Sequence, residues 1–91
     1  MIYVDPLMDH GWRLGQSCHM FADTVVELRI MAVRIGMKLK WEQPPTDRRA
    51  WPHYDLTVAR RARAIRLGVI PLDRAATVKK WNSMRTRKGE Q

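Results

Sequence analysis

The segment from Thr24 to Gly36 constrains the fold most, because it carries signals for both ends of a helix. Thr24-x-x-Glu27 has the form of a capping box, with Asp23 as an alternative cap, and Gly36 supplies a C-terminal stop. Its apolar residues form two stripes, Val25/Leu28/Met31/Ala32/Ile35 and Val26/Ile30/Val33. We therefore expect a helix that is central to the core or partly covered by a second copy of the chain.

Shorter patterns predict the remaining elements. A second helix, capped by Asp55 or Thr57, is expected to stop at Gly68, and a third to begin near residue 72. Four apolar runs predict short strands at residues 2–4, 18–22, 37–41 and 69–70. The resulting order of elements indicates a small α/β or α+β fold, with a short sheet packed against two to three helices.

The length of 91 residues allows one hydrophobic core. We expect a single α/β domain over residues 1–84 and a basic, flexible C-terminal tail over residues 85–91. No apolar run approaches the roughly 18 residues of a membrane span, and the N-terminus lacks the pattern of a signal peptide. Cys18 has no second cysteine to pair with. These features predict a cytoplasmic protein with no membrane partner.

The net charge of +8 is unevenly distributed along the chain. Residues 1–45 contain five basic and five acidic side chains, whereas residues 46–91 contain twelve basic and four acidic ones. Such asymmetry indicates an anionic partner, which would be a phosphate-bearing ligand, nucleic acid or an acidic protein surface. A solvated cationic face that only aids solubility explains the charge equally well.

Two short motifs combine histidine with aspartate: residues 17–23 contain His19 and Asp23, and residues 53–55 contain His53 and Asp55. If the two segments meet, two imidazoles and two carboxylates converge. That set would suit a divalent metal ion or general acid–base chemistry. The spacing matches no recognised metal motif, and both aspartates are also natural helix caps. Imidazoles separated by well over about 10 Å would exclude a shared metal site.

Further side chains fit a phosphate-bearing ligand. We expect His19, His53 and Tyr54 to orient such a ligand, and Trp51 is the candidate for stacking on a base. Cys18 is interpreted as a small buried hydrophobe. Arginines would neutralise the phosphate, and the candidates are Arg13, Arg48, Arg49 and Arg61.

The sequence resembles the bacterial and phage family called domain of unknown function 4031 over roughly residues 2–75. The specific segments are His19-Met20-x-Ala22-Asp23-Thr24 and His53-Tyr54-Asp55, with Tyr3-Val4-Asp5 ahead of them. The resemblance implies a small cytoplasmic α/β domain whose His/Asp pairs are family features. It implies no reaction, and the chain departs from the family pattern after about Leu72.

These observations leave three functional hypotheses, and whether the protein is an enzyme stays open. The first is a non-enzymatic protein, phage-encoded if the resemblance holds, that binds a nucleotide-type molecule or nucleic acid. The second is a small metal-dependent phosphoesterase or nuclease that uses the His/Asp set. The third is a protein–protein interaction module that acts on a host protein, with the helix at 24–36 as a homodimer seam.

Overall fold

The computed structural model describes residues 1–13, 15–46 and 51–89, with side chains as far as residue 85. The sheet has the order β3-β2-β1-β4; β2 pairs antiparallel with β1 and β3, and β4 pairs parallel with β1. The elements are β1 (Ile2–Val4), β2 (Ser17–Ala22), α1 (Val25–Arg34), the 3-10 turn η1 (Leu39–Trp41), β3 (Tyr54–Thr57), α2 (Val58–Arg66), β4 (Ile70–Pro71) and α3 (Arg74–Gly89). The small α/β fold is therefore confirmed.

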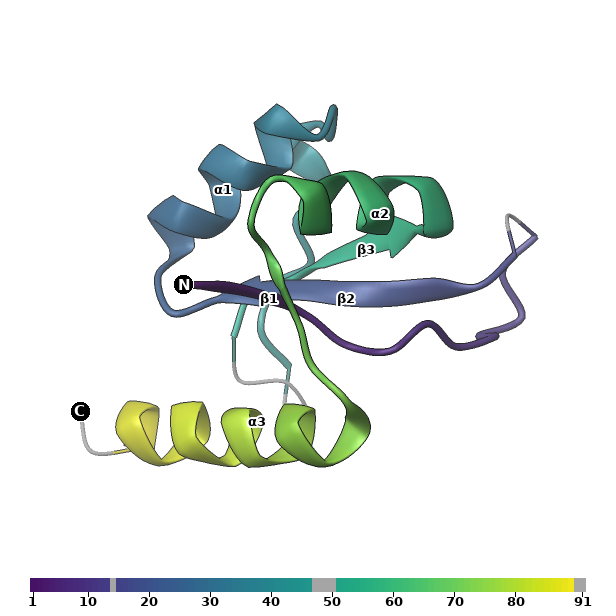
Figure 1. Cartoon of the computed structure of the whole chain (residues 1–91). Helices are drawn as coiled ribbons and strands as arrows, with labels where there is room; N and C mark the ends of the chain where they lie inside the picture. The colour runs from purple at the N-terminus through teal and green to yellow at the C-terminus, as the bar shows by residue number, and fades with distance from the viewer. Residues whose placement is uncertain (14, 47–50, 90–91) are drawn as a thin grey trace.

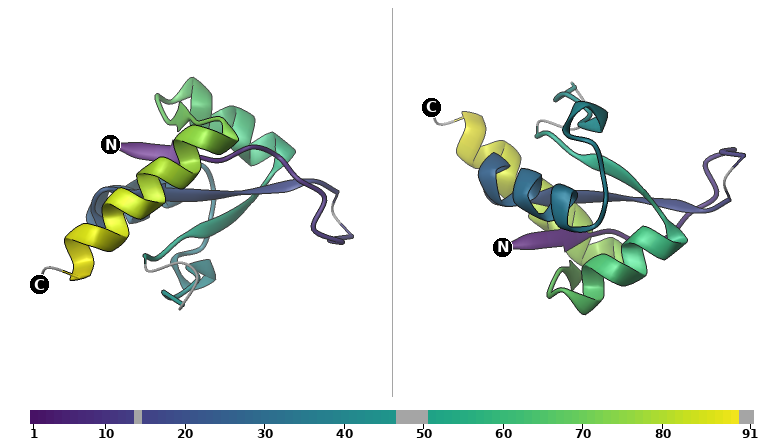
Figure 2. Two further views of the ribbon diagram at one scale, coloured as in Figure 1. Left: turned by 90° about the horizontal axis from the view of Figure 1, so that it is seen from below. Right: turned by 90° about the horizontal axis from the view of Figure 1, so that it is seen from above.

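The sheet lies between two helical layers. Helices α1 and α2 cover one face, and α3 runs across the other (Figure 1), as the views from below and above also show (Figure 2). Because successive strand residues point to opposite faces, β2 sends Met20 to the core under α1 and α2 and sends Phe21 to the smaller core under α3. Val4 and Tyr3 of β1 divide in the same way.

Helix α1 begins as its capping box predicts. The Glu27 amide donates to the Thr24 hydroxyl oxygen at 3.3 Å, and that hydroxyl donates to the Glu27 carboxylate at 2.9 Å. The helix ends before Gly36, whose φ of 84° lies in the left-handed region that favours glycine. The first apolar stripe is buried from Leu28 to Ile35 and half-buried at Val25. The second stays exposed within the single chain, at 63%, 58% and 56% for Val26, Ile30 and Val33.

The third strand lies elsewhere than predicted. Residues 37–41 do not form a strand; they contain η1, and the β2 edge is occupied by β3 from residues 54–57. The alternation in β3 explains this choice, since Tyr54 and Leu56 point into the main core of the molecule. Thr57, at the end of β3, accepts from the Arg60 amide at 3.3 Å and caps α2. Of the two predicted caps, Thr57 is thus the one used, and Asp55 lies within the strand.

Helix α3 begins after Asp73, whose carboxylate accepts from the Ala76 amide at 2.7 Å. It extends through Gly89, five residues beyond the predicted end of the domain, so the backbone of residues 85–89 is helical. The predicted flexibility of residues 85–91 stays a prediction. Among the described residues, no helix has the length and apolar character needed to cross a bilayer.

Candidate functional site

Strand pairing brings the two His/Asp motifs together. In the register of β2 with β3, His19 lies directly opposite Asp55. Met20 and Tyr54, the next pair along, fill the core under α1 and α2, so His19 and Asp55 point to the α3 side. His53 precedes β3 by one residue and is held by two main-chain hydrogen bonds to Gln43, at 2.7 and 3.2 Å.

The resulting group could hold a metal ion. One ligand atom from each of His19, His53 and Asp55 lies within 4.8 Å of the others. The His19 and His53 ring centroids are 5.3 Å apart, and His19 Nε2 lies 3.7 Å from an Asp55 oxygen. His53 is buried, whereas the Asp55 side chain is 44% exposed. The two imidazoles thus lie well inside the separation of about 10 Å beyond which a shared metal site would be excluded.

Asp5 is the site residue that the sequence interpretation missed. Its buried carboxylate accepts from the His19 main-chain amide at 2.6 Å and lies 2.7 Å from His19 Nδ1. This contact fixes the imidazole with Nε2 toward Asp55, which is how proteins orient metal-binding histidines. A signal was present, because Asp5 follows Tyr3 by two residues and so shares its face of the sheet. Asp5 lies just past the strand predicted at residues 2–4, and the local pattern predicts no role for it.

Two cavities adjoin the group. The larger, of about 470 Å³, is lined by His10, Gly11, Trp12, Ser17, His19 and Asp55. The smaller, of about 210 Å³, lies between His19 and α3 and includes Arg74 and Trp81 in its wall. His10 Nδ1 lies 2.7 Å from the Ser17 hydroxyl in the larger cavity. His19 and Asp55 lie on strands β2 and β3, whereas His53 lies just before β3.

A comparison with protein-family profiles matches residues 2–84 to a family described as "Protein of unknown function (DUF4031)". The chain belongs to the DUF4031 family. The resemblance seen in the sequence is thereby confirmed, and it reaches beyond residue 75. Searches of curated proteins and of solved structures found no match to this chain. Because the family description assigns no reaction, the function must be argued from the site itself.

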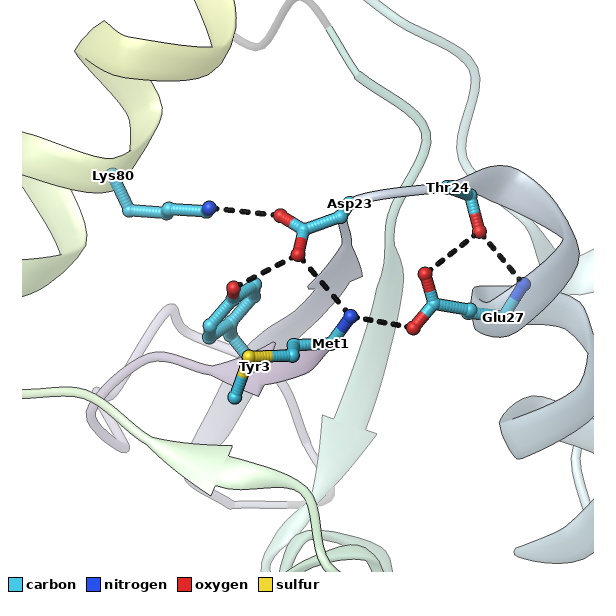
Figure 3. Close-up of polar contacts among 6 residues, drawn as sticks. All are labelled: Met1, Tyr3, Asp23, Thr24, Glu27 and Lys80. Atoms are coloured by element: carbon cyan, nitrogen blue, oxygen red, sulfur yellow. Dashed lines mark hydrogen bonds and ion pairs between the residues drawn. The ribbon is translucent and has the colours of Figure 1, made fainter.

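Asp23 lies outside the His/Asp group of this DUF4031 protein, which corrects the prediction that it joins the site. Its carboxylate contacts Lys80 at 2.8 Å, the Tyr3 hydroxyl at 3.1 Å and the Met1 amine at 3.1 Å (Figure 3). Burial alone raises the pKa of Asp23, but the hydrogen bonds from these three partners outweigh it and lower that pKa to about 2. Asp23 therefore links β1 and α3 to the start of α1.

Two predicted ligand-binding aromatic residues are part of the core. Tyr54 is fully buried and donates its hydroxyl to the Leu39 carbonyl oxygen at 3.2 Å, and burial raises its pKa. Trp51 is buried and packs with Trp81, at 5.3 Å between ring centroids. A buried ring offers no free face to a base, so neither prediction holds. The exposed tryptophans are Trp12 and Trp41, at 38% each.

The predicted arginines divide into three groups. Arg48 and Arg49 lie outside the described residues. Arg13 is exposed and is not in the walls of the cavities beside the site. Arg61 is half-buried and donates to the Asp5 carbonyl oxygen at 3.1 Å, next to the site. Arg60 and Arg74, which are not among these four, line neighbouring cavities.

Cys18 has the structural role expected from the sequence. It is buried in the core under α1 and α2, and burial raises the pKa of its thiol to about 12. A thiol with that pKa is protonated near neutral pH and is a poor nucleophile. Any chemistry in this region therefore falls to the histidines and carboxylates on the other face of the sheet.

Proposed function

We propose that the protein binds a divalent metal ion through His19, His53 and Asp55 and uses it to hold a phosphate-bearing ligand in the adjoining cavity. The observation that carries the proposal is the convergence of these three side chains, with ligand atoms within 4.8 Å of one another. Two imidazoles and one carboxylate form a common donor set for zinc. Ligands about 2.1 Å from one metal lie at most about 4.2 Å apart, so small side-chain adjustments suffice.

The surroundings of the group support a metal. His19 and Asp55 belong to paired strands, which hold their backbones in fixed register. The Asp5 carboxylate contacts Nδ1 of His19 and thereby orients the imidazole of that residue. Metal-binding side chains that are held rigidly, with an anchored residue to orient them, lose less conformational entropy when an ion binds. The set is therefore better prepared for a metal than for a ligand held by hydrogen bonds alone.

The open side of the group supports a phosphate ligand. Three protein ligands leave a fourth position on a tetrahedral ion, and His19 and Asp55 line the cavity of about 470 Å³. Arg60 and Arg74 lie nearby, and arginine side chains pair well with phosphate oxygens. The positive charge of the second half of the chain favours the approach of anions.

Hydrolysis of a phosphate ester is the second candidate, and His10 favours it. This histidine lines the same cavity and is hydrogen-bonded to Ser17. An ion held by His19, His53 and Asp55 would acidify a water molecule, which would give its proton to the solvent and form the new bond to phosphorus. As the ester P–O bond breaks, His10 would donate a proton to the leaving oxygen. The protein would then be a small metal-dependent phosphoesterase.

Calorimetric titration with Zn²⁺ tests the metal site. We expect one ion per chain in the native protein, with binding lost in Asp55→Asn and His53→Ala. The matched control is Asp73→Asn, because asparagine caps α3 as well as aspartate does. Absence of Zn²⁺ binding, or binding unchanged in both site variants, would overturn the metal proposal.

Ligand binding and turnover are tested on the same proteins. Phenyl phosphate should bind the Zn²⁺-loaded protein and bind far more weakly to the metal-free protein; equal binding would contradict the role of the metal. Turnover of bis(4-nitrophenyl) phosphate that is lost in Asp55→Asn and slowed in His10→Ala, with Zn²⁺ affinity unchanged in the latter, would support hydrolysis. Binding without turnover would exclude hydrolysis and leave the binding function.

A further inference from the structure

We propose that the cleft between Trp12 and Trp41 holds the base of a nucleotide whose phosphate lies at the metal site. The inference rests on the proposed function and names the class of its ligand, a nucleobase linked to phosphate. Such a unit occurs in a free nucleotide and in single-stranded nucleic acid, and both sources would present the same chemistry to the cleft.

The first supporting observation is the cleft itself. It has a volume of about 300 Å³ and is lined by Trp12, Met37, Trp41, Gln43, Asp55 and Arg60. That volume is at the lower end of the range of about 300–1,000 Å³ for small-molecule sites. Trp12 and Trp41 are the exposed tryptophans of the described chain, since Trp51 is buried in the core under α3 and Trp81 is half-buried against it. Exposed indole faces in a cleft are typical platforms for stacked bases.

Cations at Trp41 provide the second observation. Arg60 lies 5.5 Å from the centre of the Trp41 ring, and Lys38 Nζ lies 5.6 Å from it. Both distances are within the range of cation–π contacts, which hold an exposed ring in place. The two positive charges also attract a ligand that carries phosphate. An apolar partner protein would gain nothing from cations at this position, so the chemistry favours a nucleotide.

Proximity to the metal site is the third observation. Trp12 and Asp55 line both the cleft and the larger cavity, which His19 also lines. The two cavities are therefore neighbours, which places the tryptophan cleft beside the proposed metal site. Gln43 adds a polar group to the cleft, and its main chain pairs with that of His53. Glutamine amides commonly pair with base edges, so Gln43 is suited to contact the edge of a stacked base.

The test compares ligands that share a phosphate and differ in the base. Calorimetry on the Zn²⁺-loaded protein would use adenosine 5′-monophosphate, ribose 5-phosphate and a short single-stranded oligonucleotide. We expect the nucleotide to bind at least about tenfold more tightly than the sugar phosphate, because base–aromatic stacking provides an increment of that size. Trp41→Ala should remove most of this difference, and Trp41→Phe should keep most of it.

Controls separate this inference from the proposed function. Val26→Ala changes an exposed apolar residue on α1, away from the cleft, and should leave both affinities unchanged. Retained Zn²⁺ binding shows that a Trp41 variant has folded; if Trp41→Ala does not fold, the native protein and Trp41→Phe still give the comparison. Equal binding of nucleotide and sugar phosphate would overturn the base site while leaving the metal–phosphate proposal intact.

The remaining outcomes are also distinct. If Zn²⁺ binds and neither phosphate compound does, the phosphate part of the proposed function fails together with this inference. If Zn²⁺ itself does not bind, the metal site of the proposed function is overturned, and the base site that rests on it is overturned with it. Binding of the oligonucleotide that is tighter than that of the nucleotide, and that weakens steeply with salt, would identify nucleic acid as the source. Similar affinities for the two would identify a free nucleotide.

Discussion

The two faces of the sheet are built from the same strands and differ in chemistry. Toward α1 and α2, β2 and β3 present apolar side chains that are fully buried, with Met20, Tyr54 and Leu56 among them. Toward α3, the same strands present Phe21 at one end and the pair of His19 and Asp55 at the other. Because side chains alternate between the two faces of a strand, one residue belongs to the stabilising core and its neighbour belongs to the candidate site.

Helix α3 explains why the second face is divided. Its Trp81 and Met84 pack on the apolar end around Phe21, and Lys80 ties the helix to Asp23. The polar end of the same face opens into cavities instead of a packed core. Buried polar groups are tolerated only where they have partners, and His19 has Asp5. Substitution of a residue on the face toward α1 and α2 should therefore affect folding. Substitution at the polar end of the face toward α3 should affect ligand binding.

The largest expected difference is between variants of two neighbouring residues on β3, Leu56 and Asp55. Leu56→Ala should lower the free energy of unfolding by about 2–5 kcal/mol, because it leaves a cavity in a fully buried site. Asp55→Asn should change stability by less than about 1 kcal/mol, because its side chain is 44% exposed, and should abolish Zn²⁺ binding. Urea unfolding and calorimetry measure the two quantities. Equal effects of both variants on stability would contradict the division of the faces.

A smaller effect is expected at Asp5, which supports a metal ligand without being one. Asp5→Asn should weaken Zn²⁺ binding about 10- to 100-fold, because the amide orients the His19 imidazole less well than a carboxylate does. Calorimetric titration of the variant checks this, with a circular dichroism spectrum to confirm folding. An unchanged Zn²⁺ affinity would show that His19 is not a ligand or that Asp5 does not position it.

Acid should weaken the attachment of α3 through Asp23. The folded-state pKa of about 2 lies below the ordinary value of 3.8, so the contribution is present above about pH 4 and is lost as the pH falls toward 2. It amounts to about 2 kcal/mol. Urea unfolding of the native protein and Asp23→Asn at pH 7 and near pH 2 measures it. The stability difference between them should shrink in acid, and a constant difference would contradict the assignment.

The smallest effect is expected on the exposed stripe of α1. Ile30→Ser should change the unfolding free energy of a monomer by less than about 0.5 kcal/mol, since Ile30 is 58% exposed. Light scattering would compare the masses of the native protein and the variant. A native dimer that Ile30→Ser dissociates would support the predicted homodimer seam, and a monomeric native protein would exclude it.

The local signals in the sequence predicted much of this fold. The capping box at Thr24, the stop at Gly36 and the strands at residues 2–4 and 18–22 depend on neighbouring residues, and the structure bears them out. The two-residue spacing of His53 and Asp55 is likewise one that places both side chains on one side of an extended segment. These features follow from backbone periodicity and capping, which act over a few residues.

Pairing across the chain decided the rest. The sequence could not show that residues 54–57, rather than 37–41, form the strand beside β2. Both segments are short, and only pairing with β2 distinguishes them. Asp5, just after β1, contacts His19 on the neighbouring strand β2, and Asp23 contacts Lys80 on α3. The burial of Tyr54 and Trp51 depends on which face of the sheet each helix covers. Residue type and spacing thus determined the elements and the candidate chemistry, while long-range packing determined which side chains meet.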